Sequence, residues 1–196
     1  MLVRDAMSRP AYTVGPNATL KEAMTLLDER SVTSLPVVNA AGRILGIVSE
    51  ADLIAEMVPP DTRLHMVPET EEARVMPAQS VVEVMNRHPV TVNVDTDLAE
   101  ATDLMTSTAI KSLPVLDEHK RVVGVVSRRD VVRLLARPDA VLEGEVDDLF
   151  RRMGKDWLVD VRDGVVTVTG PVDERERHLA TTAAGTVPGV TGVDIT

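Results

Sequence analysis

Two short stretches of the chain carry the same polar residues at the same spacing. Residues 46–53 read GIVSEADL and residues 124–131 read GVVSRRDV, a separation of 124 − 46 = 78 positions. In each stretch, an apolar run with β-branched residues passes into Ser-x-x-Asp, which is typical of a strand that ends where a helix begins. A serine and a carboxylate in this arrangement can cap the helix, and they can also hold a bound ligand.

Capping is the simpler interpretation of each stretch taken alone. Ser49 and Ser127 would be N-cap residues, and Asp52 and Asp130 would complement the helix dipole three positions later. The alternative is a ligand site, because a helix N-terminus that faces a cleft offers free N–H groups to a phosphate. The carboxylate could then accept hydrogen bonds from the hydroxyls of a ribose.

The two stretches belong to a longer internal repeat. A shift of 78 positions aligns most of residues 4–55 with residues 82–133 without gaps. Such a match indicates duplicated structural units. Each unit has about 55 residues, a marginal size for an independent core, so we expect the two to pack together with two related clefts between them.

Each unit is expected to fold in the order β-α-β-β-α. Apolar residues recur at helical spacing after a polar cap at Asn17 or Thr19, and the segments 34–39, 44–49 and 50–57 read as strand, strand and helix. The second unit repeats this order. The predicted fold class is therefore α+β, with helices and strands mixed.

The last part of the chain has a different pattern, α-β-β-α-β, in fewer than 60 residues. A short amphipathic helix is expected within 143–154, and alternating apolar residues around Asp163-Gly164 indicate a β-hairpin. A second helix follows, with Asp173 and Glu176 at capping-box positions, and residues 188–196 close the pattern as a strand.

Composition argues against several classes of protein. The net charge is −10, so a large basic face for phosphates is not expected. The chain has one Trp, one Tyr and one Phe, too few aromatic side chains for a surface on which bases stack. No nucleic-acid partner is therefore expected. The chain has no cysteine and its four histidines are scattered, so no metal site is expected. No apolar run suits a membrane helix or a secretory signal, which predicts a cytoplasmic protein.

The repeated landmarks resemble the CBS domain. They are Met-x-x-x-x-x-Thr-Val, Ser-Leu-Pro-Val and Gly-Ile/Val-Val-Ser-x-x-Asp, and they occur in the same order within 1–57 and within 78–137. The tandem is therefore similar to a CBS pair, or Bateman module. Residues 58–77 are expected to form a linker, with a short helix at 69–76.

The C-terminal residues resemble the BON domain. The resemblance rests on the hairpin sequence of residues 159–172 and on VPGVTGVDI at 187–195, and it places a BON domain at 141–196. BON domains are associated with phospholipid surfaces and other macromolecules, which implies a protein or phospholipid partner. Acidic residues are interleaved with the basic ones in this part of the chain, and such mixing is typical of a solvated face.

The CBS resemblance implies an adenine-nucleotide ligand, with AMP, ADP, ATP, NAD and S-adenosylmethionine as candidates and no required cofactor. It implies that Asp52 and Asp130 hold ribose, that the serines lie near ribose or phosphate, and that apolar residues frame adenine. The candidate nucleotide-binding residues are Thr13, Val32, Leu35, Pro36, Ser49 and Asp52 in the first unit, and Thr91, Ile110, Lys111, Ser112, Leu113, Pro114, Ser127, Arg128, Arg129 and Asp130 in the second.

The two units differ in charge near these residues. Lys111 stands at the position of Thr33, and Arg128-Arg129 stand at the positions of Glu50-Ala51. Phosphates favour cations, and arginine suits paired oxygens, so the cleft of Asp130 is expected to hold phosphate better. The alternative is that these residues are solvated surface charges.

The predicted function is that of a non-enzymatic regulatory protein. The CBS pair would bind the nucleotide, the BON domain would report its state to a partner or surface, and the resemblance to CBS pairs implies a homodimer. The alternative is a scaffold protein with vestigial clefts. An enzyme is disfavoured, because the sequence has no cysteine, no grouping of nucleophile, histidine and acid, and no P-loop.

Overall fold

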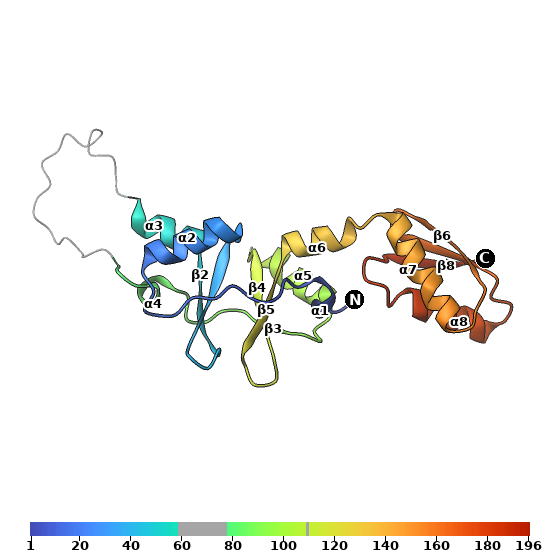
Figure 1. Ribbon diagram of the computed structural model, residues 1–196, viewed down its shortest axis with the longest axis horizontal. Coiled ribbons are helices and arrows are strands. Elements are labelled where there is room, and N and C mark those ends of the chain that lie inside the picture. The colour runs from blue at the N-terminus through green and yellow to red at the C-terminus, as the bar shows by residue number, and fades with distance from the viewer. Residues whose placement is uncertain (59–77, 109) are drawn as a thin grey trace, which may run out of the picture. The chain divides into compact units, whose positions relative to one another are not determined.

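A computed structural model describes residues 1–58, 78–108 and 110–196, so the short helix expected at 69–76 lies outside the described residues (Figure 1). The helices are α1 (Val3–Ala6), α2 (Leu20–Arg30), α3 (Glu50–Met57), α4 (Val81–Val84), α5 (Leu98–Ser107), α6 (Arg128–Leu135), α7 (Asp139–Arg152) and α8 (Glu174–Ala184). The strands are β1 (Ser34–Val38), β2 (Ile44–Ser49), β3 (Val92–Asn93), β4 (Ser112–Leu116), β5 (Val122–Ser127), β6 (Leu158–Arg162), β7 (Val165–Thr169) and β8 (Gly192–Ile195). This mixture of helices and strands confirms the predicted α+β class.

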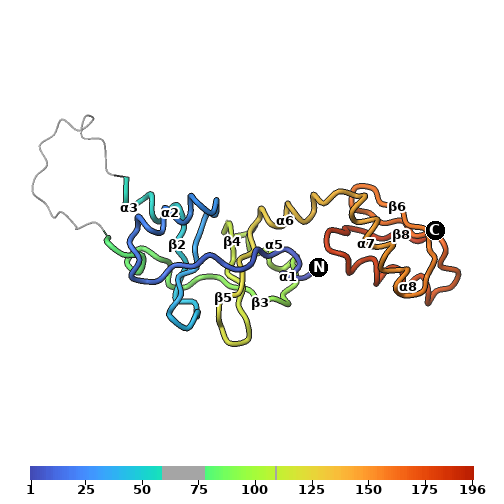
Figure 2. The backbone as a smooth tube through the Cα atoms, viewed as in Figure 1, coloured from blue at the N-terminus to red at the C-terminus, as the bar shows by residue number. Residues whose placement is uncertain are grey.

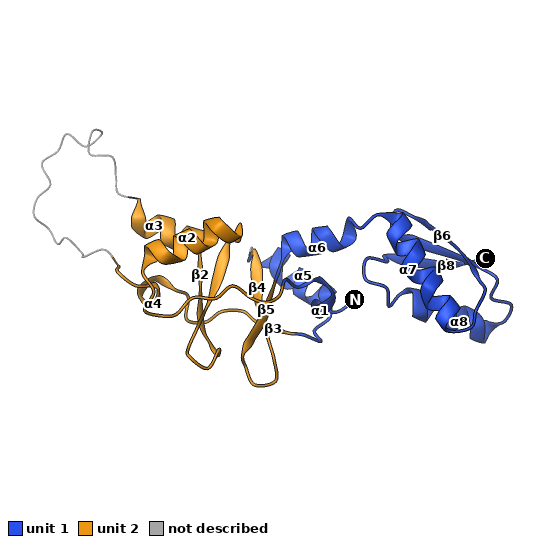
Figure 3. Ribbon diagram, viewed as in Figure 1, with its two compact units in different colours: residues 1–8, 94–110, 126–196 blue, residues 9–93, 111–125 orange. Residues whose placement is uncertain are grey.

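The described strands form three sheets. Their orders are β1-β2, β3-β4-β5 and β6-β7-β8. The chain divides into two compact units, one of residues 1–8, 94–110 and 126–196 and the other of residues 9–93 and 111–125 (Figure 3).

The compact units cut across the sequence repeats. The short helices α1 and α4 are exchanged, and β3, β4 and most of β5 of the second repeat group with the first repeat. Helix α1, from the start of the first repeat, contacts α5 and α6 of the second, as the chain trace in Figure 2 shows. Helix α4, from the start of the second repeat, contacts α3 of the first. Backbone hydrogen bonds fix both helices, with Val3 N–H donating to Thr96 O and Val81 N–H donating to Ala18 O, each at 2.9 Å.

The first repeat folds around an aliphatic core. Thr19 is the N-cap of α2 and forms a capping box with Glu22. Of the two polar caps predicted, Asn17 and Thr19, the cap is therefore Thr19. Strands β1 and β2 pair antiparallel, with Leu35 opposite Val48. The buried core residues are Val14, Leu20, Ala23, Leu27, Leu35, Val37, Val48, Leu53, Val81 and Met85.

The opening strand of the predicted β-α-β-β-α order forms in the second repeat, and the prediction is wrong for the first repeat. In the second repeat β3 pairs parallel with β4, whereas in the first repeat Val14 forms only a single bridge to Val37. Gly15-Pro16 follows Val14, where the second repeat has Asn93-Val94. Because proline lacks the backbone N–H that a ladder needs, pairing ends at Val14.

The C-terminal elements form a three-stranded sheet with α7 and α8 packed on it (Figure 1). Strands β6 and β7 form the predicted hairpin, and Asp163 and Gly164 both have positive φ, as this tight turn requires. Strand β8 runs parallel to β7. The core includes Phe150 and Trp157, whose rings meet edge to face with centroids 5.0 Å apart.

Two expectations for this part of the chain need correction. Helix α7 begins at Asp139, four residues before the expected start, and the Asp139 carboxylate accepts hydrogen bonds from Asp163 N–H and Gly164 N–H of the hairpin turn. Asp173 caps α8, but the reciprocal half of the capping box is not formed. The Glu176 carboxylate instead accepts hydrogen bonds from Val172 N–H and from the Lys155 amine.

Candidate functional site

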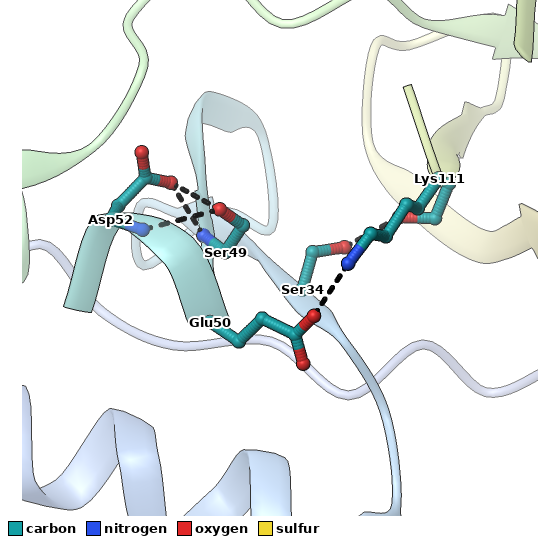
Figure 4. Close-up of polar contacts among 6 residues, drawn as sticks. Ser34, Ser49, Glu50, Asp52 and Lys111 are labelled. Atoms are coloured by element: carbon teal, nitrogen blue, oxygen red, sulfur yellow. Dashed lines mark hydrogen bonds and ion pairs between the residues drawn. The ribbon is translucent and has the colours of Figure 1, made fainter. Parts of the chain in front are cut away.

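The junction between β2 and α3 has the geometry of a capping box. Ser49 Oγ accepts a hydrogen bond from Asp52 N–H at 3.4 Å, and Asp52 Oδ2 accepts from Ser49 N–H at 2.8 Å and from Ser49 Oγ at 2.6 Å. Figure 4 shows the other carboxylate oxygen of Asp52 pointing away from Ser49. This oxygen has no hydrogen-bond partner among the described residues, and the side chain is only half-buried, so it is open to a ligand donor.

The junction between β5 and α6 repeats the capping box and adds two partners. Asp130 Oδ2 accepts hydrogen bonds from Ser127 N–H and Ser127 Oγ, while Asp130 Oδ1 accepts from Ser8 Oγ at 2.8 Å and from Arg133 Nη1 at 3.2 Å. Asp130 is only 6% exposed. Its buried charge is therefore satisfied by four donors from the chain itself.

Lys111 and Glu50 form an ion pair beside the first junction. Lys111 Nζ lies 2.6 Å from Glu50 Oε1, and Figure 4 shows the two side chains directed at each other. Glu50 is the first residue of α3, and its negative charge, which by itself would repel a phosphate, is balanced by a lysine from the other repeat. Lys111 and Asp130, which were expected to act together, belong to different compact units.

The other two cations are exposed. Arg128 and Arg129 begin α6, and neither forms an ion pair with a residue that the structure describes. Their side chains therefore remain available to an anion.

The remaining candidate residues separate into core and accessible positions. Leu35, Pro36, Leu113 and Pro114 are buried in β1 and β4. The Oγ atoms of Ser112 and of its repeat counterpart Ser34 lie 2.6 Å apart and are also buried. The residues that stay half-buried are Thr13, Val32, Thr91 and Ile110. Val32 and Ile110 are therefore the apolar candidates that a ligand could reach without displacing core side chains.

Sequence reasoning missed Ser8 and Arg133 as partners of Asp130. Arg133 follows Asp130 by three positions on α6, a spacing at which helical side chains meet, so it could have been found. Ser8 is 122 positions away, and only the exchange of α1 brings it to the second repeat. No local feature of the sequence predicts that contact.

A cleft of about 470 Å³ lies next to Asp130 within the same compact unit. Its lining comes from α1, from α6 and from the C-terminal elements, and consists of Asp5, Ala6, Asp130, Arg133, Leu134, Arg137, Glu145 and Pro188. Both arginines in this lining are paired, Arg133 with Asp130 and Arg137 with Glu145.

The described residues offer neither a metal-binding cluster nor a membrane-spanning helix. Within residues 1–58, 78–108 and 110–196, no three His, Asp or Glu side chains are grouped so that they could hold a metal ion. None of the helices in these ranges is long and apolar enough to span a membrane.

Comparison with known families identifies the parts of the chain. The family model of the CBS domain matches residues 3–59 and 81–137, and that of the BON domain matches residues 138–195. A CBS domain-containing protein of Dictyostelium discoideum is 33% identical over 139 residues, which are 70% of this chain and 92% of that protein. Two further curated relatives are longer, and the chain spans 23% and 60% of their length.

Two similar solved structures contain adenosine-based ligands. The CBS domain pair of protein MJ0100, in complex with 5′-methylthioadenosine and S-adenosylmethionine, has a TM-score of 0.57 and 26% identity, covering 69% of this chain and 100% of that chain. CBSX2 of Arabidopsis thaliana, in complex with AMP, has a TM-score of 0.55 and 27% identity, covering 74% of this chain and 98% of that chain.

Proposed function

Because the chain belongs to the CBS domain family and carries a BON domain, we propose that it is a non-enzymatic regulatory protein that binds an adenine nucleotide at its CBS pair. One observation carries this proposal. Asp52 caps α3 with one carboxylate oxygen and leaves the other without a partner among the described residues. A ribose hydroxyl can donate to that oxygen without breaking the cap. The adenosine group shared by the ligands of MJ0100 and CBSX2 supports the same assignment.

We expect Asp52 to contribute more to binding than Asp130, although the distribution of charges in the sequence favours the second cleft. Asp130 already has four donors, and a ribose would have to replace Ser8 or Arg133. At the first junction, a ligand phosphate would compete with Glu50 for Lys111. This exposed ion pair contributes about 0.2–1 kcal/mol, so the exchange costs little.

The BON domain would report the state of the ligand site to a partner. A ligand that binds one arrangement of the protein more tightly shifts the population toward it. We favour a protein partner over a phospholipid surface, because several basic side chains of this domain are paired with acids. The pairs are Arg151 with Asp147, Lys155 with Glu176 and Arg162 with Asp160. The cytoplasmic location and the homodimer remain predictions.

Calorimetric titration tests the proposal. AMP, ADP, ATP, NAD and S-adenosylmethionine would be titrated into the wild type and into the Asp52→Asn and Asp130→Asn variants. We expect saturable binding that Asp52→Asn weakens about tenfold or more, the effect of losing a hydrogen bond to a charged group.

Glu22→Gln is the matched control. Glu22 completes the capping box of α2, as Asp52 does for α3, so its substitution should cost stability without changing affinity. Equal affinity in all variants would contradict the site assignment.

A scaffold protein is the second candidate function. The observation that favours it is Asp130, whose carboxylate is buried and satisfied with no ligand needed. Absence of heat with every ligand, in variants that remain folded, would favour the scaffold.

A further inference from the structure

Arg137 connects the end of α6 to the BON domain at two points. Its Nη1 donates a hydrogen bond to the carbonyl oxygen of Pro188, and its Nη2 forms an ion pair with Glu145 of α7. The side chain of Arg137 is 22% exposed, whereas that of Glu145 is 47% exposed. Arg137 is therefore a fixed element of this contact, and Glu145 is its more accessible partner.

The backbone next to this arginine is closely packed. A Cβ atom on Gly189 would lie 3.0 Å from Leu134 O and 3.3 Å from Arg137 Cδ. The Gly189 N–H donates to Met1 Sδ at 3.4 Å. The amide of Gly189 therefore reports on whether the BON domain stays against Met1 and the end of α6.

The same arginine borders the cleft that contains Asp130. Arg133 follows Asp130 by three positions on α6, and Arg137 lies two residues beyond the end of that helix. Both arginines line the cleft together with Asp130. Both arginines are held by acids, Arg133 by Asp130 and Arg137 by Glu145. A ligand bound at Asp130 with an extended anionic tail would meet both cations in turn.

We propose that Arg137 has two alternative partners, Glu145 of the BON domain and the phosphate tail of a nucleoside di- or triphosphate held at Asp130. This inference rests on the proposed function and extends it to the second junction, where the ribose would take the place of Ser8 as a partner of Asp130. A guanidinium group binds phosphate oxygens in pairs, and a partly exposed carboxylate is a weak competitor. Nucleotide binding therefore weakens the contact between α6 and the BON domain. Because coupling between two equilibria is reciprocal, weakening that contact strengthens nucleotide binding.

Glu145→Gln separates the two uses of Arg137, since it removes the competing charge and keeps the arginine. The matched control is Glu143→Gln, on the same helix, because Glu143 is exposed and forms no ion pair with a described residue. ADP and adenosine would be titrated into the wild type and both variants by calorimetry. Hydrogen exchange of the Gly189 amide would be followed in parallel, with and without ADP.

We expect Glu145→Gln to bind ADP about two- to fivefold more tightly than the wild type, as the loss of a competing exposed ion pair allows. Adenosine, which has no phosphate, should bind the wild type and Glu145→Gln with equal affinity. The Gly189 amide should exchange faster in Glu145→Gln, and in the wild type once ADP is added. Glu143→Gln should match the wild type throughout.

The outcomes distinguish this inference from the proposed function. The proposed change of partner at Arg137 is wrong if ADP binds the wild type and Glu145→Gln with equal affinity. It is also wrong if Glu145→Gln raises the affinity for adenosine as much as the affinity for ADP. In both cases the nucleotide-binding function stands. If neither ADP nor adenosine binds the wild type or the variants, both are wrong.

Discussion

The same Ser-x-x-Asp motif has different surroundings in the two repeats. Asp130 is buried among Ser127, Ser8 and Arg133, whereas Asp52 is half-buried and has Ser49 as its hydrogen-bond partner among the described residues. The capping and ligand-binding interpretations are therefore compatible at Asp52, because they use different oxygens. At Asp130 they compete, because both oxygens already accept hydrogen bonds.

Glu176 makes the stability of the BON domain depend on pH. The hydrogen bond from the Lys155 side chain, followed by that from Val172 N–H, holds the pKa of the Glu176 carboxyl below its usual range. A group with a lowered pKa in the folded state contributes stability above its unfolded pKa, and this contribution is lost as the pH falls through the folded pKa. We expect the free energy of unfolding to fall as the pH drops below about 4.3, the usual pKa of glutamate.

Denaturant unfolding followed by the fluorescence of Trp157, the single tryptophan, checks this prediction. Glu176→Gln should show a shallower loss of stability with falling pH than the wild type. Glu174→Gln is the control, since Glu174 lies in the same helical turn and forms no ion pair with a described residue. A Glu176→Gln curve parallel to that of the wild type would rule out this carboxyl as the source.

Exchange of the short helices α1 and α4 explains why neither repeat is a complete folding unit. Helix α4 supplies Val81 and Met85 to the core of the first repeat, and α1 packs on α5 and α6 of the second. The residues that follow α4 contact β2 closely. Ile47 and Asn86 exchange backbone hydrogen bonds, with N···O distances of 3.0 and 2.8 Å.

Gly46 permits this approach of Met85 and Asn86 to β2. A Cβ atom at position 46 would lie 2.6 Å from Asn86 O and 2.7 Å from Met85 Sδ. Gly46→Ala should therefore destabilise the protein by about 1–3 kcal/mol, the usual effect of overpacking. Chemical denaturation followed by circular dichroism would measure it.

Gly144→Ala is the contrasting substitution. Gly144 lies inside α7 with open space around the position of a Cβ atom, so alanine should stabilise the helix by about 0.5–1 kcal/mol. A Gly46→Ala variant as stable as the wild type would show that α4 can move away from β2 at no cost.

At the scale of the whole molecule, the repeat leaves matching apolar residues exposed on two helices. Ile54 and Met57 of α3 correspond to Val132 and Leu135 of α6 under the shift of 78 positions, and all four are exposed. Exposed apolar side chains at equivalent positions are typical of surfaces that bury on association. They are the surfaces that we predict to form the homodimer.

Light scattering after size-exclusion chromatography tests the dimer. The wild type should elute as a dimer at micromolar concentration, and the double variant Ile54→Glu with Val132→Glu should be a monomer, because two buried charges would oppose association. The control is Val172→Glu, at a position of the BON domain that is 86% exposed. A monomeric wild type would refute the predicted dimer, and a dimeric double variant would place the interface elsewhere.

The sequence by itself determined the features that depend on near neighbours or on a fixed repeat. The capping boxes of Thr19 with Glu22 and of Ser49 with Asp52 join residues three positions apart, and the Asp163-Gly164 turn joins adjacent strands. The order of elements that the two repeats share, all but the opening strand, follows from the 78-residue period. Such features are predictable because backbone geometry alone brings these residues together.

Only the tertiary structure decided which charged and polar groups meet across the chain. Ser8 contacts Asp130 across 122 positions, Lys111 contacts Glu50 across 61, and Arg137 contacts Pro188 across 51. The contact of Ser8 depends on the exchange of α1, and the other two depend on how distant segments of the chain pack together. A partly exposed side chain has many partners of similar energy, so its choice follows the packing of apolar faces and is not encoded by its own neighbours in sequence.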